Sequence, residues 1–369
     1  MKLALNRRAM FWLTCCCSFF MALWGCSIAK VPDEIPSRDF GDYRGAVHAI
    51  SFAPDESAIA TSHFPQHEYD ARVHYIAQPC GNVRIWKHPN HPALDDDWFE
   101  YGLIANIKPG WLPIASFDLD GRILTNAFTE FFESDASGAK LRKFPISRPH
   151  VVDAQRRRVA CLTDDDEPAR VVVRSFDGED LAPPLECPDP TDMRGHPPQL
   201  LRSFSSDGRW LITTTMNEVL IWDWANMKLQ ARFHAEFMWP SLIGGVFAPD
   251  GHTIAVAHSL EEVRLYDIGT SQLRGAFRHP QARLHNMSFS PDGKLLAACG
   301  EGEDKLGGGL WLWRVSDQQL IRSIRRSDVW GITALEFAPT SPILVVGDCE
   351  GEIRQYALSD LVHSTARAN

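Results

Sequence analysis

The chain has 369 residues, of which 44% are hydrophobic and 23% charged, and this composition excludes a disordered chain and a protein with many membrane spans. The length exceeds that of a usual single domain and indicates either two domains or one large closed architecture. With a formal net charge of −10, no nucleic-acid partner is expected, because phosphate binding needs a basic face. Beyond Arg156-Arg157-Arg158, which we interpret as a solvated turn, no Lys/Arg cluster is visible.

Residues 1–25 predict an export signal. Basic residues precede an uncharged run, residues 9–25, whose length suits export better than a membrane span. The run ends in Leu23-Trp24-Gly25-Cys26, which resembles the lipobox of bacterial lipoproteins. The resemblance implies that Cys26 becomes the lipidated first residue of the mature protein. An uncleaved anchor helix is the alternative.

The segment after the signal, residues 26–42, is rich in charge and contains Pro32 and Pro36, which predicts a tether. Five cysteines follow Cys26, an odd number that cannot pair completely, and their spacings match no zinc pattern. We expect most of them to be small buried residues, with at most one unassigned disulfide. They are Cys80, Cys161, Cys187, Cys299 and Cys349.

From residue 43 onward the chain repeats a strand, a tight turn and a second strand. Clear or looser copies begin at Ile50, Ala115, Arg202, Gly245, Met287 and Leu335. The turns read Pro-Asp-Gly or a close variant, in which Pro presets φ, Asp bonds the backbone and Gly takes the left-handed position. The pattern predicts a β-hairpin in each copy.

A third strand with an aromatic residue near its end follows each hairpin, and a short fourth strand follows that. Third strands are predicted at Val83-Arg-Ile-Trp-Lys, Val219-Leu-Ile-Trp-Asp, Val263-Arg-Leu-Tyr-Asp, Leu310-Trp-Leu-Trp-Arg and Ile353-Arg-Gln-Tyr-Ala. In the same register, residues 130–134 with 140–144 complete a second repeat, and residues 171–175 with 180–184 complete a third. The count is seven, and either residues 35–40 or residues 361–365 would supply the outer strand of the last sheet.

Four antiparallel strands that recur at about 40 to 50 residues resemble the WD40 family over nearly all of residues 43–369. The resemblance implies an all-β fold, a seven-bladed β-propeller of four-stranded antiparallel blades. The repeats are divergent, since only Trp222-Asp223 is a Trp-Asp pair at the third-strand end and only Gly195-His196 is placed like the family's Gly-His element. Propellers of the TolB or quinoprotein kind stay open and predict the same shape.

In the WD40-type arrangement, the loops before the first strand and between the second and third strands share one rim, here called the top. The residues predicted to line it and to bind a partner are Tyr43, Trp111, Trp239, Trp330 and His285. Trp and Tyr dominate protein contacts, although packing against their own blades is the alternative. The loops at residues 62–82 and 300–309 are enlarged and would rise from one sector of the top.

Neither catalytic nor metal-binding motifs stand out. The histidines of the first enlarged loop and the run Asp164-Asp-Asp-Glu167 lack ligand spacing, so no metal and no cofactor are expected. A nucleophile elbow, a phosphate loop and a His-Glu-x-x-His pattern are absent, which favours a protein that is not an enzyme.

The sequence thus predicts an interaction scaffold in the bacterial cell envelope. It would be held at the membrane by the lipid anchor, would face the periplasm or the exterior, and would bind protein partners. One alternative is a propeller enzyme or a binder of a small ligand or metal in the central channel. Another is a purely structural part of an envelope complex.

Overall fold

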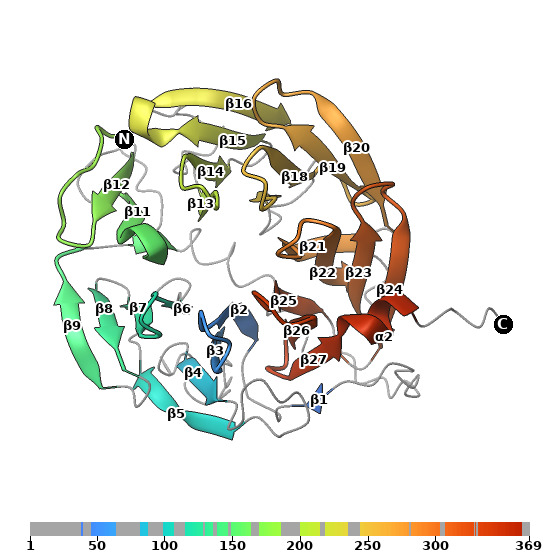
Figure 1. Cartoon of the computed structure of the whole chain (residues 1–369), viewed down its shortest axis with the longest axis horizontal. Coiled ribbons are helices and arrows are strands. Elements are labelled where there is room, and N and C mark those ends of the chain that lie inside the picture. Colours follow the sequence, from blue (N-terminus) through green and yellow to red (C-terminus); the bar gives the residue numbers. More distant parts are fainter. Residues whose placement is uncertain are drawn as a thin grey trace, which may run out of the picture. The chain divides into compact units, whose positions relative to one another are not determined.

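A computed structural model describes residues 38–39, 46–63, 82–87, 99–106, 115–127, 130–135, 139–146, 149–163, 170–185, 200–214, 218–234, 244–279, 282–302, 307–327, 329 and 331–363. All of them belong to one compact unit, Asp33–Asn369. This unit consists of seven antiparallel sheets arranged around a common axis (Figure 1).

The first three sheets come from the first half of the chain. The first sheet contains β2 (Val47–Phe52), β3 (Ala58–His63), β4 (Asn82–Lys87) and β5 (Phe99–Asn106). The second contains β6 (Ala115–Phe117), β7 (Ile123–Ala127), β8 (Glu130–Ser134) and β9 (Lys140–Phe144). The third contains β10 (Pro149–Asp153), β11 (Arg158–Leu162) and β12 (Val171–Ser175), with the 3-10 helix η1 (Ala154–Arg156) between the first two.

The next three sheets have four strands each. The fourth contains β13 (Leu200–Phe204), β14 (Trp210–Thr214), β15 (Glu218–Asp223) and β16 (Lys228–His234), with the 3-10 helix η2 (Trp224–Asn226) before the last. The fifth contains β17 (Gly245–Phe247), β18 (Thr253–Ala257), β19 (Glu262–Asp267) and β20 (Leu273–Arg278). The sixth contains β21 (Ala282–Phe289), β22 (Leu295–Gly302), β23 (Gly308–Arg314) and β24 (Leu320–Arg326).

The seventh sheet closes the ring with strands from both ends of the chain. It contains β25 (Ile332–Phe337), β26 (Ile343–Asp348), β27 (Ile353–Ala357) and β1 (Arg38–Asp39), and β1 pairs antiparallel with β27. Of the two segments left open for this outer strand, the structure shows the first, residues 35–40, through its pair Arg38–Asp39. The alternative segment began at Leu361, and residues Leu358–His363 form the helix α2 instead of a strand.

One prediction for the third sheet is wrong. Residues 180–185 do not form a fourth strand. They pair with β12 only through two isolated bridges, Val171 with Leu185 and Arg174 with Asp180. The physical reason is Pro183-Pro184, since a proline has no backbone N–H to donate to a ladder.

Burial explains why the second strand of each sheet is so apolar. The side chains of β3, β14, β18 and β26 are buried along the whole strand, because both faces of the sheet are covered by neighbouring sheets. The outer strand β9 is exposed at four of its five positions. The core is therefore divided into seven apolar clusters, one between each pair of adjacent sheets, including the pair formed by the seventh and first sheets.

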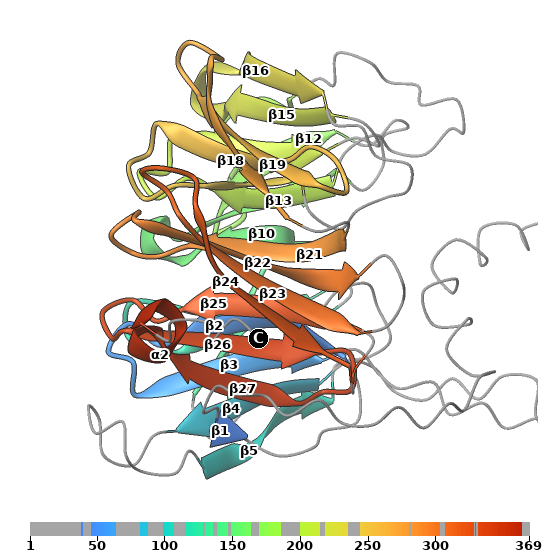
Figure 2. The same cartoon turned by 90° about the vertical axis from the view of Figure 1, so that its right-hand side faces the viewer.

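The hairpin turns between first and second strands lie at the rim opposite the top, the side marked by α2 in Figure 2. Their chemistry agrees with the sequence. Asp250 Oδ1 accepts hydrogen bonds from the backbone N–H groups of His252 and Thr253, both at 2.8 Å, and Gly251 has φ of +69°. These turns fix the register of each hairpin.

Part of the hydrogen-bond network of strong WD40 blades is present in two sheets. Trp222 Nε1 donates to Thr213 Oγ1 at 2.9 Å, and Trp86 Nε1 donates to Thr61 Oγ1 at 3.1 Å. The hydroxyl of Thr61 also lies 2.8 Å from Nε2 of His63. These bonds tie the third strand to the second, and they align Thr213 with Thr61 in the repeat.

A glutamate clasp holds the first sheet to the seventh at the bottom rim. Glu56 occupies the turn position that is glycine in the second, fourth, fifth and sixth sheets, with φ of +58°. Its carboxylate accepts hydrogen bonds from the backbone N–H and hydroxyl groups of Thr340 and Ser341. A non-glycine residue in the left-handed region is strained. The bonds to the last sheet explain why the strain is tolerated.

The clasp should make stability depend on pH. Burial opposes ionisation of Glu56, but the hydrogen bonds from Ser341 and Thr340 outweigh it and hold the pKa below its ordinary value. A depressed pKa gives stability that is present above the unfolded-state pKa and lost as the pH falls through the folded-state pKa. We expect Glu56→Gln to lower the free energy of unfolding by about 2 kcal/mol at pH 7 and to remove part of the acid-induced loss. Urea unfolding at a series of pH values measures this, and an unchanged pH profile would contradict the clasp.

Candidate functional site

Most residues predicted to line the top lie outside the described part of the chain. These are Tyr43, Trp111, Trp239 and Trp330, and the predicted lipidation residue Cys26 lies outside it as well. The structure describes His285, which is half-buried on β21, the innermost strand of the sixth sheet. Its position led to a feature that the sequence did not reveal.

His285 is the extra residue of a β-bulge. In β21 the register with β22 shifts between Leu284 and Asn286, so that His285 has no partner in the ladder. The innermost strands of four other sheets have the same irregularity at one residue each. We call the five bulged residues the bulge ring: His48, His150, Arg202, His285 and Thr333.

A bulge bends a strand and re-aims the side chain of the extra residue. All five members of the bulge ring are half-buried. Neighbours such as Val47, Leu284 and Ile332 are buried in the clusters between sheets. Four of the five carry nitrogen atoms that can donate a hydrogen bond, whereas the fifth, Thr333, donates its hydroxyl to the carbonyl of Val47 at 2.6 Å.

The bulges lie at two levels along the axis. Those at His48, His285 and Thr333 come four residues before the phenylalanine that ends the strand, as in His285-Asn-Met-Ser-Phe289. Those at His150 and Arg202 lie two ladder positions closer to the bottom rim, about 7 Å by the rise of a strand. The upper three belong to the sixth, seventh and first sheets, which adjoin one another.

Arg202 bridges the two levels. Its Nε donates to Oγ1 of Thr214 at 3.3 Å, so the side chain runs from the lower bulge toward the top. Thr213 aligns with Thr61 in the repeat, so Thr214 aligns with Ser62. His48 is the bulged residue beside Ser62, and the Arg202 side chain, bonded to Thr214, therefore reaches the level of His48. Burial lowers the pKa of Arg202 to about 10, which leaves the guanidinium charged at neutral pH.

The charge of Arg202 acts on His48, although the two residues belong to the fourth and first sheets. Burial and the nearby Arg202 guanidinium together lower the pKa of His48 to about 4, so its imidazole is neutral at pH 7. Strands β2 and β13 lie on opposite sides of the centre of the ring (Figure 1). The two residues are therefore within electrostatic reach of each other across the axis.

Besides His150 of the third sheet, further ionisable groups of the described residues lie on the innermost strands of the sixth and seventh sheets. His285 Nε2 lies 4.0 Å from Oε1 of Glu301, and burial keeps the pKa of this histidine below its ordinary value despite that carboxylate. Glu336, on β25, is one residue before the final phenylalanine of its strand, where the first, second, fourth and sixth sheets have serine. Burial raises the pKa of Glu336 to about 8, so it is largely protonated at pH 7.

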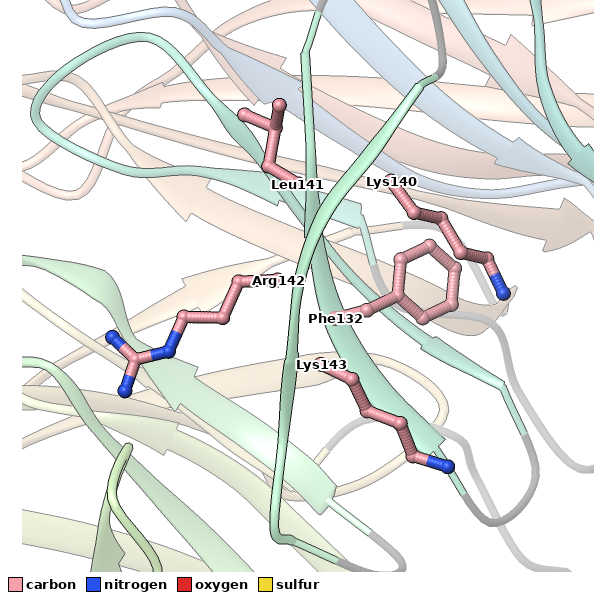
Figure 3. Close-up of a pocket in the computed structure, with 5 residues that line it drawn as sticks. All are labelled: Phe132, Lys140, Leu141, Arg142 and Lys143. Atoms are coloured by element: carbon pink, nitrogen blue, oxygen red, sulfur yellow. The ribbon is translucent and has the colours of Figure 1, made fainter.

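A separate shallow groove of about 120 Å³ lies at the outer edge of the second sheet (Figure 3). It is lined by Phe132 and by the exposed residues Lys140 to Lys143 of β9. The ammonium group of Lys140 stacks 4.2 Å from the centre of the Phe132 ring, and Arg142 pairs with Asp177 at 2.7 Å. The groove is distant from the bulge ring, and its lining offers neither a carboxylate nor a nucleophile.

Three further results concern metals, disulfides and membrane spans. Within the described ranges, no group of three or more His, Cys, Asp or Glu side chains is arranged to hold a metal ion. Of the five cysteines after Cys26, Cys161, Cys299 and Cys349 are described, and no disulfide joins these three to one another. The helices among the described residues are all too short or too polar to cross a membrane.

Seven sheets around one axis, each buried against its two neighbours and closed by strands from both ends of the chain, define this protein as a seven-bladed β-propeller. Residues 271–306, from the fifth and sixth sheets, match the model of the WD40 family, described as WD domain, G-beta repeat. WD repeat-containing protein 90 of Xenopus tropicalis is 24% identical over 272 residues, which cover 69% of this chain and 14% of that protein. The chain thus spans a small part of this relative's length, and the findings together support a propeller of the WD40 type.

Sequence reasoning placed His285 before the first strand of its sheet, as a partner-binding residue of the top rim, whereas the structure places it within β21, and the bulge ring itself was not predicted. A signal for two more members was present, because His48 and Thr333 precede Phe52 and Phe337 by the same four residues that separate His285 from Phe289. Arg202 and His150 could not be found in this way, since their bulges fall at a different position in the repeat.

Proposed function

We propose that this protein is a lipid-anchored, extracytoplasmic scaffold whose top rim binds a protein partner in the bacterial envelope. The observation that carries the proposal is the closed ring, because WD40 propellers typically present their rims to protein partners. A rigid scaffold that displays variable loops is suited to recognition. Among the connections between second and third strands, the one of the first sheet, from His63 to Asn82, is the longest, whereas the enlargement predicted for the sixth sheet is wrong, since β22 extends to Gly302 and β23 begins at Gly308.

The anchor part of the proposal rests on the sequence Leu23-Trp24-Gly25-Cys26. Lipidation at Cys26 would place the propeller at a membrane surface after cleavage of residues 1–25. Metabolic labelling with a radioactive fatty acid in a bacterial host should mark the wild-type protein and leave Cys26→Ser unlabelled. Equal labelling of both proteins, or of neither, would contradict lipidation at Cys26.

The partner part is tested with the aromatic residues predicted for the top. Trp239→Ala and Trp330→Ala should each reduce capture of the envelope partner at least tenfold, because truncation of an aromatic anchor typically costs about 2 kcal/mol of binding free energy. The far-ultraviolet circular dichroism of both variants should stay unchanged. Leu141→Ala, on the outer edge of the second sheet, serves as the control and should bind normally. Undiminished capture by both tryptophan variants would argue against the top rim as the partner site.

A further inference from the structure

We propose that the bulge ring binds a small oxyanionic group, phosphate or carboxylate, between Arg202 and His48 on the axis of the propeller. The site goes beyond partner binding at the rim, because it lies among the innermost strands, and it does not depend on the lipid anchor.

The first argument is the charge of Arg202. Among the described residues, its only hydrogen bond is the one from Nε to the neutral Thr214 hydroxyl, and it forms no ion pair with a carboxylate there. Four of its five N–H donors are therefore without an acceptor in this part of the chain. A half-buried guanidinium without a counter-charge is costly, and a bound oxyanion would offset that cost with bidentate hydrogen bonds.

The second argument is the set of groups that face Arg202. His48 lies in its electrostatic reach across the axis and is neutral at pH 7, so this side of the site carries no second positive charge. His150 occupies the lower level beside Arg202 on the adjacent sheet. Neither Glu301 nor Glu336 offsets the charge of the Arg202 guanidinium. Glu301 lies near His285 and Arg283, and Glu336 is largely protonated at pH 7.

The third argument is the position of the bulges. In the fourth sheet the bulge is two positions lower than in the first, sixth and seventh sheets, and this offset lets the long Arg202 side chain end at the level of His48. A bulge at the upper position would place the same side chain about 7 Å closer to the top rim. The irregularity thus brings the two groups to one level.

The test uses the full chain and two probes, inorganic phosphate and acetate, added at constant ionic strength. The imidazole signals of His48 in nuclear magnetic resonance spectra, assigned with His48→Gln, should shift and saturate as the preferred probe is added. Arg202→Gln should weaken that association about tenfold or more, because it removes a charge-assisted bidentate contact. Arg232→Gln is the matched control in the same sheet, since Arg232 pairs with Glu218 away from the axis, and it should bind like the wild type.

Unfolding in urea provides an independent measurement. In buffer without either probe, Arg202→Gln should unfold at a urea concentration equal to or above that of the wild type, because an uncompensated charge has been removed. The preferred probe should then raise the midpoint of the wild type and leave that of Arg202→Gln unchanged. Arg202→Lys, which keeps the charge but not the planar fork, should bind several times more weakly than the wild type.

The proposal would be overturned by a His48 signal that does not respond saturably to either probe, or by equal binding in the wild type and Arg202→Gln. A strongly lowered urea midpoint of Arg202→Gln in probe-free buffer would also overturn it, since Arg202 would then be a structural residue. Saturation by phosphate alone would assign a phosphate-bearing ligand. Saturation by acetate alone would assign a carboxylate.

Discussion

Arg326→Ala should lower the free energy of unfolding by about 3–5 kcal/mol, because it leaves a buried carboxylate without its partner. Arg326 ends the outer strand of the sixth sheet and is 2% exposed. Its Nη1 donates to Oδ2 of Asp348 at 2.9 Å, and its Nη2 donates to Oε2 of Glu352 at 2.5 Å. Asp348, 1% exposed, and Glu352 belong to the seventh sheet, so the pair joins two neighbouring blades.

The measurement is the midpoint of urea unfolding, followed by circular dichroism. Arg325→Ala is the control, since Arg325 is the exposed neighbour on the same strand and its replacement should cost less than about 1 kcal/mol. Equal effects of the two substitutions would show that the buried ion pair does not hold the sixth sheet to the seventh.

Phe131→Ala should cost a similar amount, about 3–5 kcal/mol, through the loss of a core aromatic ring. Phe131 is buried completely between the second and third sheets, where its ring centre lies 5.0 Å from that of Phe144 and 5.3 Å from that of Phe176. The third sheet has only three strands, so this cluster supplies much of its contact with the rest of the ring.

A double-mutant cycle tests the cluster directly. Phe131→Ala and Phe176→Ala should together cost less than the sum of the two single substitutions, because each removes part of the same contact. Leu141→Ala, exposed on the outer strand of the second sheet, should change stability by less than about 0.5 kcal/mol. Additive costs for the two phenylalanines would mean that they do not pack as a unit.

The sequence predicted most of the fold because each repeat carries its own local signals. Turn chemistry and apolar strands located the hairpins, and the register of the third and fourth strands followed; residues 130–134 and 140–144 are indeed β8 and β9. The missing strand of the third sheet was a failure to give enough weight to Pro183-Pro184. At Glu56 the turn formed although its sequence lacks the usual glycine, because the hydrogen-bonded carboxylate of Glu56 stabilises the left-handed backbone there.

The candidate site was much harder to predict, because it depends on irregularities of register and not on a motif. A bulge moves one residue out of the ladder, and a sequence pattern with a period of two residues does not mark where this happens. The approach of Arg202 to His48 also joins positions 154 residues apart, which only closure of the ring brings together. No spacing within one repeat contains that information.

Crosslinking at opposite rims of one blade tests the central claim, that this propeller binds a protein partner through its top, most directly. Arg283 lies at the top end of β21 and Lys294 in the bottom turn of the same hairpin, with side chains 57% and 79% exposed. A photo-crosslinking residue introduced at each position in living cells should trap one discrete partner from position 283 and none from position 294. Equal trapping from both positions, or trapping from position 294 alone, would contradict the account.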